Sequence, residues 1–106
     1  MIRTYARRSK DRFCLYVSGH AEKSAEGDRV CAAVSVLVGM LICHAQEHQG
    51  CRHVRACRAS GSCSLAFTGA LGDILERVLK TIDTLAVEYP THVARVSYLC
   101  DEGDKK

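Results

Sequence analysis

The sequence predicts an α+β fold in which two helices pack on a mainly antiparallel sheet, within a single domain spanning residues 1–106. Two segments show helical spacing of apolar residues, and short runs rich in β-branched and aromatic residues lie around them. The length of 106 residues, about 47% of them apolar, suits one hydrophobic core. The expected order of elements is β-β-α-β-β-α-β.

The first two elements are expected to be strands, at residues 2–5 and 13–17. The second strand is clearer because FCLYV is dense in aromatic and β-branched residues. The stretch that follows, residues 18–28, is polar, contains two glycines and lacks periodicity. It therefore predicts a mobile loop.

The first helix is expected to begin at Asp28, a good N-cap residue directly before the apolar pattern. Apolar residues recur at helical spacing over 30–45, and the helix should end within 47–50. Ser35 and His44 interrupt this stretch, so no apolar run reaches the ~20 residues that a membrane helix needs. We therefore expect a buried helix and no association with a membrane.

The second half of the chain predicts a hairpin, a helix and a last strand. Residues 53–58 and 62–67 form the hairpin. A helix then runs from about Gly72 to Glu88, and Pro90 ends it. The last strand covers 92–100, and the charged residues after it should be frayed. Because both hairpins connect neighbouring strands, the sheet should be mixed or mainly antiparallel.

The cysteine content and the N-terminus indicate a cytoplasmic protein. The seven cysteines are an odd number, and the basic N-terminus lacks the apolar stretch of a secretory signal. A disulfide framework is therefore not expected, and free cysteines pack as small hydrophobes.

The net charge of +3 is mild, so we expect no direct binding of nucleic acid. Basic residues do cluster locally, over 3–12 and again over 52–58. A solvated, solubilising face is the favoured interpretation of both clusters. A docking surface for an anionic partner such as RNA is the alternative.

His20 and Cys31 form a candidate catalytic pair. If the helix begins at Asp28, Cys31 lies at its third position, near free amide groups and the positive end of the helix dipole, which favour a thiolate. His20 on the preceding loop can fold back, take the thiol proton and later protonate a leaving amine. The same free amides could hold an oxyanion. The alternative is an ordinary core cysteine beside a surface histidine.

Two further residues are candidates for assisting this pair. Ser35 lies one turn beyond Cys31 on the same helical face, where it could orient a side chain or contact substrate. Asp28 could serve His20 as a carboxylate partner instead of capping the helix.

The stretch Gly19-His20-Ala21, Gly27-Asp28 and Val30-Cys31-Ala32-Ala33-Val34-Ser35 resembles the signature of the ribosomal-processing cysteine protease family (Prp). That signature runs Gly-His-Ala, a loop, Gly-x-Asp or Gly-Asp, a hydrophobic residue and Cys-Ala-x-x-Ser. The resemblance is closest over residues 18–37. The chain departs from the family at Arg29, where Ile or Leu is common, and in a His-to-Cys loop about one residue shorter than in some members.

The resemblance implies a small, cytoplasmic, homodimeric cysteine protease, and we expect neither a cofactor nor a metal. Family members remove a short N-terminal extension from a large-subunit ribosomal protein, cutting after an aromatic residue. His20 matches the catalytic histidine and Cys31 the nucleophile. Asp28 and Ser35 match positions that assist substrate binding or site geometry, and Gly19 and Gly27 belong to the same motif.

Three other functions remain open. Cysteine and histidine residues concentrated over 43–63 could form a zinc-binding module, although no Cys-x-x-Cys pair is present. A non-catalytic, dimeric, ribosome-associated binding module could use the arginine clusters. A cysteine enzyme could also act on something other than a ribosomal protein.

Overall fold

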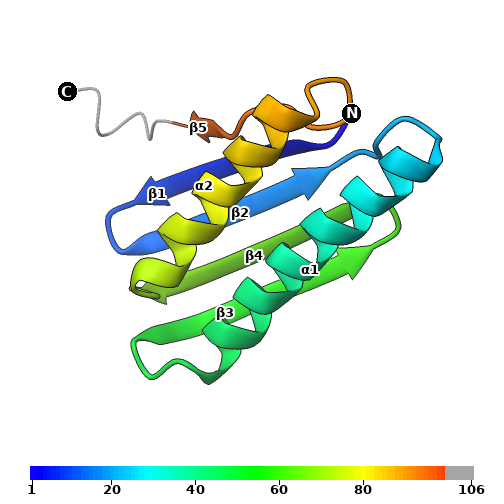
Figure 1. Ribbon diagram of the computed structural model, residues 1–106. Coiled ribbons are helices and arrows are strands. Elements are labelled where there is room, and N and C mark those ends of the chain that lie inside the picture. Colours follow the sequence, from blue (N-terminus) through cyan, green and yellow to red (C-terminus); the bar gives the residue numbers. More distant parts are fainter. Residues whose placement is uncertain (100–106) are drawn as a thin grey trace.

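The computed structural model describes residues 1–99 and confirms the order β-β-α-β-β-α-β. A five-stranded, mostly antiparallel sheet has the strand order β3-β4-β2-β1-β5, and both helices cross the same face of it (Figure 1). The elements are β1 (Arg3–Ser9), β2 (Arg12–Ser18), α1 (Ala25–Glu47), β3 (Cys51–Ala59), β4 (Ser62–Gly69), α2 (Asp73–Glu88) and β5 (Ser97–Leu99).

The sheet is built from two hairpins and one added strand. β1 pairs with β2 and β3 with β4, each antiparallel, and β2 joins the hairpins by pairing antiparallel with β4. A bulge interrupts the register of β3 between Arg52 and Arg55. The last strand, β5, is parallel to β1 and forms one edge of the sheet.

The hydrophobic core lies between the sheet and the two helices. Successive strand residues point to opposite faces, so alternate residues of β2 and β4 are buried. The Phe13 and Phe67 rings meet there with centroids 5.4 Å apart. The helices contribute Val34, Val38 and Leu41 from α1, and Val78 and Ile82 from α2.

The first helix begins earlier than the sequence predicts. It starts at Ala25, and Ser24 is the N-cap, with its hydroxyl accepting the Gly27 N–H at 2.9 Å. The prediction that Asp28 caps the helix is therefore wrong; Asp28 is exposed in the first turn. The apolar pattern marks where the helix becomes mostly buried, whereas a serine cap and a largely exposed first turn precede it. Consequently Cys31 lies in the second turn.

By length and composition alone, α1 could cross a membrane, with 23 residues and a mean hydropathy of 1.7. In the fold, its apolar side packs on the core, and Val30, Val34, Val38, Leu41 and Ile42 are buried. The core helix of a globular domain can have the same length and mean hydropathy.

The predicted last strand over 92–100 is mostly wrong. Only residues 97–99 form a strand, although Val93 makes an isolated bridge to Ile2. Between Val93 and residue 97 the backbone does not continue the strand. The Val96 N–H there donates a hydrogen bond to Asp83 Oδ1 of α2 at 2.7 Å. Cys100 and the predicted frayed tail lie outside the described residues.

Candidate active site

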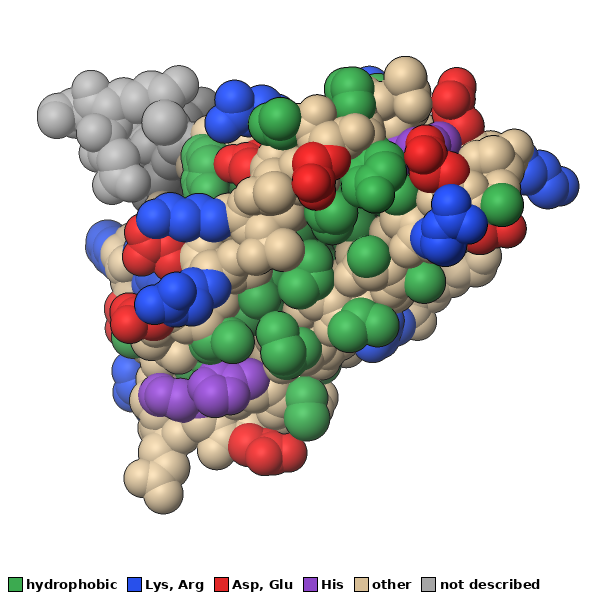
Figure 2. All heavy atoms as spheres, viewed as in Figure 1, with side chains coloured by type: hydrophobic (Ala, Val, Ile, Leu, Met, Phe, Trp, Pro, Cys, Tyr) green, Lys and Arg blue, Asp and Glu red, His purple; other side chains and the backbone are tan. Residues whose placement is uncertain are grey.

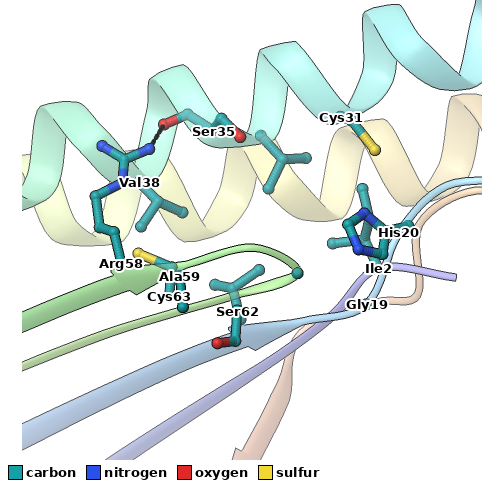
Figure 3. Close-up of a pocket in the computed structure, with 13 residues that line it drawn as sticks. Ile2, Gly19, His20, Cys31, Ser35, Val38, Arg58, Ala59, Ser62 and Cys63 are labelled. Carbon is teal, nitrogen blue, oxygen red and sulfur yellow. Dashed lines mark hydrogen bonds between the residues drawn. The ribbon is translucent and has the colours of Figure 1, made fainter.

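A cavity of about 130 Å³ lies where α1, the end of β2 and the β3–β4 hairpin meet. Its lining includes four of the residues that the sequence singled out: Gly19, His20, Cys31 and Ser35 (Figure 3). Gly27 and Asp28 do not line the cavity. The fold therefore brings His20 and Cys31 to one hollow, as the hypothesis of a catalytic pair requires.

Cys31 presents its sulfur from the second turn of α1. The side chain is half-buried, and Figure 3 shows the sulfur pointing to the side of the helix on which His20 lies. The Ala21 N–H donates a hydrogen bond to Cys31 Sγ at 3.3 Å. The prediction that free amides of the first helical turn flank Cys31 is wrong, because those amides lie one turn earlier. The amide that reaches the sulfur comes from the loop instead.

His20 enters the cavity because two glycines allow close packing around it. Gly19 has φ +93°, and a side chain there would strike the carbonyl of Met1. Gly61, in the β3–β4 turn, has φ +77°, and a Cβ there would lie 2.7 Å from His20 Nε2. The imidazole therefore rests on the bare backbone of this turn. His20 and Cys31 form no mutual hydrogen bond within the described chain, a common state of catalytic pairs before substrate binds.

The loop between His20 and the helix is held by His92, a residue that is only 3% exposed. The Glu22 N–H donates to His92 Nδ1 at 3.1 Å, and His92 Nε2 lies 3.1 Å from Glu26 Oε1. Since Nδ1 accepts a bond, the imidazole proton is on Nε2 and is donated to Glu26. Sequence reasoning placed His92 in a strand and missed this contact.

Gly27 also serves this loop, although it does not touch the cavity. It is buried, and a Cβ there would overlap the carbonyl oxygen of Glu22. The loop can approach the helix only because position 27 has no side chain. The glycine of the motif is thus needed for this close packing.

The far wall of the cavity contains Arg58 and Cys63, which the sequence did not assign to this site. Arg58 Nη2 donates to the Ser35 carbonyl oxygen at 3.3 Å, and Figure 3 shows this bond across the cavity. Burial raises the pKa of the Cys63 thiol, and the nearby Arg58 opposes that rise. Cys63 is therefore a neutral thiol at pH 7, unsuited to nucleophilic attack.

Two sequence hypotheses find no geometric support. Asp28 is exposed, and no ion pair joins it to His20 in the described part of the chain. Among residues 1–99, no three His, Cys, Asp or Glu side chains converge to hold a metal ion. The cysteines and histidines of 43–63 are instead spread along α1 and β3 and into β4.

The sequence model of a family described as "Cysteine protease Prp" matches residues 1–94. No curated protein matches the sequence. Three solved structures are similar. SMU.848 from Streptococcus mutans has 22% identity and a TM-score of 0.71, and the match covers 95% of this chain and 99% of that one. The essential ribosomal processing protease Prp from S. aureus has 19% identity and a TM-score of 0.69 in complex with a covalently linked product peptide, with 93% of this chain and 100% of that one covered; in complex with a substrate peptide it has 15% identity and a TM-score of 0.68, with 95% and 100% covered. At these identities the structures show a shared fold.

Proposed function

The chain belongs to the cysteine protease Prp family, and from this premise we propose that Cys31 is its nucleophile and His20 its general base and acid. We further propose that it removes a short N-terminal extension from a large-subunit ribosomal protein, cutting after an aromatic residue. The observation that carries the proposal is the shared cavity, which holds His20 and Cys31 and no other described histidine.

The geometry supports an acyl-transfer sequence. His20 takes the Cys31 proton, and Sγ attacks the carbonyl carbon of the scissile bond, forming a C–S bond and an oxyanion. When the oxyanion collapses, the C–N bond breaks and His20 returns the proton to the leaving amine. Water, deprotonated by His20, then hydrolyses the thioester and restores the thiol. The Ala21 N–H, 3.3 Å from the sulfur, is a candidate donor to the oxyanion.

The walls of the cavity suit an aromatic substrate side chain. Ile2, Val17, Val34 and Val38 supply apolar surface around a volume of about 130 Å³. A buried apolar cavity of about 150 Å³ holds a benzene molecule in another protein, so the space is right for one ring. The S. aureus relatives are described as ribosomal processing proteases, one with a substrate peptide, which supports the same substrate class here.

The test is cleavage of a peptide that copies the N-terminal extension of a large-subunit ribosomal protein, followed by mass spectrometry. We expect the wild type to cut after the aromatic residue. Cys31→Ala and His20→Ala should each lose at least about a thousandfold in kcat/KM. Cys63→Ala is the matched control, because it removes the other thiol of the cavity and should retain activity.

Two outcomes would contradict the proposal. Cleavage by Cys31→Ala would show that Cys31 is not the nucleophile. If the folded wild type does not cut the peptide but iodoacetamide modifies Cys31 before the other cysteines, the protease has a different substrate.

We also propose that the chain acts in the cytoplasm as a homodimer, as the family resemblance implies. The outer face of the helices offers apolar surface, since Val36 and Val87 are each 69% exposed, and Figure 2 shows hydrophobic side chains gathered along this face. Light scattering should give twice the chain mass of 11.6 kDa, and Val36→Glu should reduce it to one chain. A monomeric wild type at micromolar concentration would contradict the dimer.

A further inference from the structure

The face of the sheet opposite the helices is open. Both helices lie on the other face (Figure 1), and no helix or strand of residues 1–99 covers this one. Side chains alternate between the two faces of a strand, and residues directly opposite each other on neighbouring strands share a face. Because Phe13, Leu15 and Val17 face the core, the residues between them face outward.

The pairing of the strands brings arginines from both clusters of the sequence to this open face, whereas Arg58 turns to the helix side. Tyr5 lies opposite Tyr16, and Arg3 and Arg7 follow the same alternation on β1. Toward the other edge of the sheet, on β3, Arg55 lies opposite Ala66 of β4, which in turn lies opposite Cys14 of β2. The arginines of the face are Arg3, Arg7, Arg12, Arg52 and Arg55.

The open face presents five arginines although the net charge of the whole chain is only +3. None of the described strand residues that point to this face is acidic. Asp11, in the turn between β1 and β2, approaches Arg52 at 3.7 Å and offsets one of the charges. The net charge of +3 predicts no binding of nucleic acid, but a net charge does not show whether the arginines share one surface.

Two tyrosines stack in the middle of this arginine-rich face. The Tyr5 and Tyr16 rings lie with centroids 6.4 Å apart and planes inclined by 26°. Tyr16 is 47% exposed, so its ring is accessible to a ligand. Proteins that bind single-stranded nucleic acid combine aromatic rings, on which bases stack, with cationic side chains that contact the phosphates.

We propose that the open face of the sheet binds single-stranded nucleic acid, with bases on the Tyr5–Tyr16 platform and phosphates on the arginines of β1 and β3. An acidic protein would satisfy the arginines but gives no role to a stacked pair of rings of which one, Tyr16, is exposed. The cavity with Cys31 lies on the helix side of the sheet, so a nucleic acid and a peptide can be held at once. The proposal is therefore independent of the protease function.

The first test measures fluorescence anisotropy of labelled twelve-nucleotide U and dT strands with the full chain, from 50 to 200 mM salt. We expect micromolar affinity at low salt. Arg3→Gln/Arg55→Gln should weaken binding at least about tenfold. It should also reduce the slope of log K against log salt by about 1.4, since each phosphate contact with a single strand contributes about 0.7. The matched control, Arg77→Gln/Lys80→Gln, removes two charges from exposed positions of α2 and should bind as the wild type does.

The second test separates base stacking from simple attraction to a polyanion. Tyr16→Val retains a good strand residue but removes the ring. It should weaken oligonucleotide binding at least about fivefold and leave heparin binding unchanged. Far-UV circular dichroism confirms that each variant is folded. The ratio of the U and dT affinities identifies RNA or DNA as the preferred ligand.

Three results would overturn the proposal. The first is no binding at 100 μM protein in 50 mM salt. The second is an equal loss in the α2 control, which would place the contact elsewhere. The third is an unchanged affinity in Tyr16→Val, which would reduce the face to a general anion-binding patch that an acidic protein could use as well.

Discussion

His92 should control activity through the position of the loop that carries His20 and Ala21. Its two ring nitrogens make separate contacts, Nδ1 with the Glu22 N–H and Nε2 with Glu26. Two substitutions separate these contacts. His92→Asn keeps an acceptor at the position of Nδ1, whereas His92→Gln keeps a donor near the position of Nε2.

The magnitudes follow from burial. In His92→Gln, the part-buried Glu22 N–H loses its acceptor, which costs about 1 kcal/mol of unfolding free energy. In a domain of this size, that lowers Tm by roughly 4–8 °C. His92→Asn loses only the bond to Glu26, whose side chain is 55% exposed and can be solvated, together with some packing. His92→Ala loses both bonds and leaves a cavity, at a cost of about 2–4 kcal/mol.

The effect on catalysis should differ from the effect on stability. Because the Ala21 N–H contacts Cys31 Sγ, a loop displaced by about 1 Å misplaces both a donor and His20. We expect kcat of His92→Gln to fall about ten- to a hundredfold with little change in KM, and kcat of His92→Asn to remain within about threefold of the wild type.

The assay is cleavage of the ribosomal-protein peptide at 20 °C, well below the Tm of each variant, with Tm measured in parallel. Equal kcat values for His92→Asn and His92→Gln would refute the reasoning, because the bond to Glu22 would then have no role in positioning. A loss in both variants that follows only their Tm values would reduce His92 to a structural residue.

Three other changes test separate parts of the structure. Gly61→Ala should reduce kcat at least about tenfold in the peptide assay, since the new Cβ would lie 2.7 Å from His20 Nε2. Because the backbone at Gly61 is left-handed, the substitution should also lower the free energy of unfolding by about 1 kcal/mol in denaturant. Full activity would show that the His20 ring does not rest on this turn. Thr4→Val should be neutral or raise stability by up to about 1 kcal/mol, because the buried Thr4 hydroxyl has no hydrogen-bond partner in the described chain, and a lower Tm would contradict this. Cys63 should alkylate slowly at pH 7.5 by peptide mapping, because burial raises its pKa above 9.0. Because the pKa of the Cys63 thiol is raised in the folded state, the contribution of the neutral thiol to the free energy of unfolding is present below about pH 9 and is lost at higher pH. Cys63→Ala should thus lose less stability between pH 8 and 10.5, and an unchanged pH dependence would count against a buried thiol.

The order of elements could be predicted because each buried face has its own period in the sequence. FCLYV alternates in burial along β2, and the second helix spans 73–88 against an expected 72–88. The boundaries that the sequence misplaced are those set by polar contacts. Ser24 caps α1 four residues before the predicted start, and the chain around His92 bonds to loop and helix instead of extending a strand.

The candidate pair could be found in the sequence, whereas its surroundings could not. His20 and Cys31 are close in the chain and joined by a short loop, so local reasoning brings them together. Gly61, Arg58 and Cys63 reach the same cavity from a hairpin some 30 residues beyond Cys31, and only the pairing of β2 with β4 places them there. No local pattern encodes that pairing, because register is decided by the whole core.

The same pairing explains how a mildly charged chain acquires a basic surface. Counted along the chain, Arg3 and Arg55 are 52 residues apart and belong to clusters that look like solvated faces. In the sheet they lie on strands separated only by β2 and β4, whose outward residues there are Cys14, Tyr16, Ser64 and Ala66. A surface needed only for solubility gains nothing from stacked tyrosines, since lysines and arginines alone suffice. The rings therefore distinguish a binding surface from a solubilising one, and Tyr16→Val is the decisive variant.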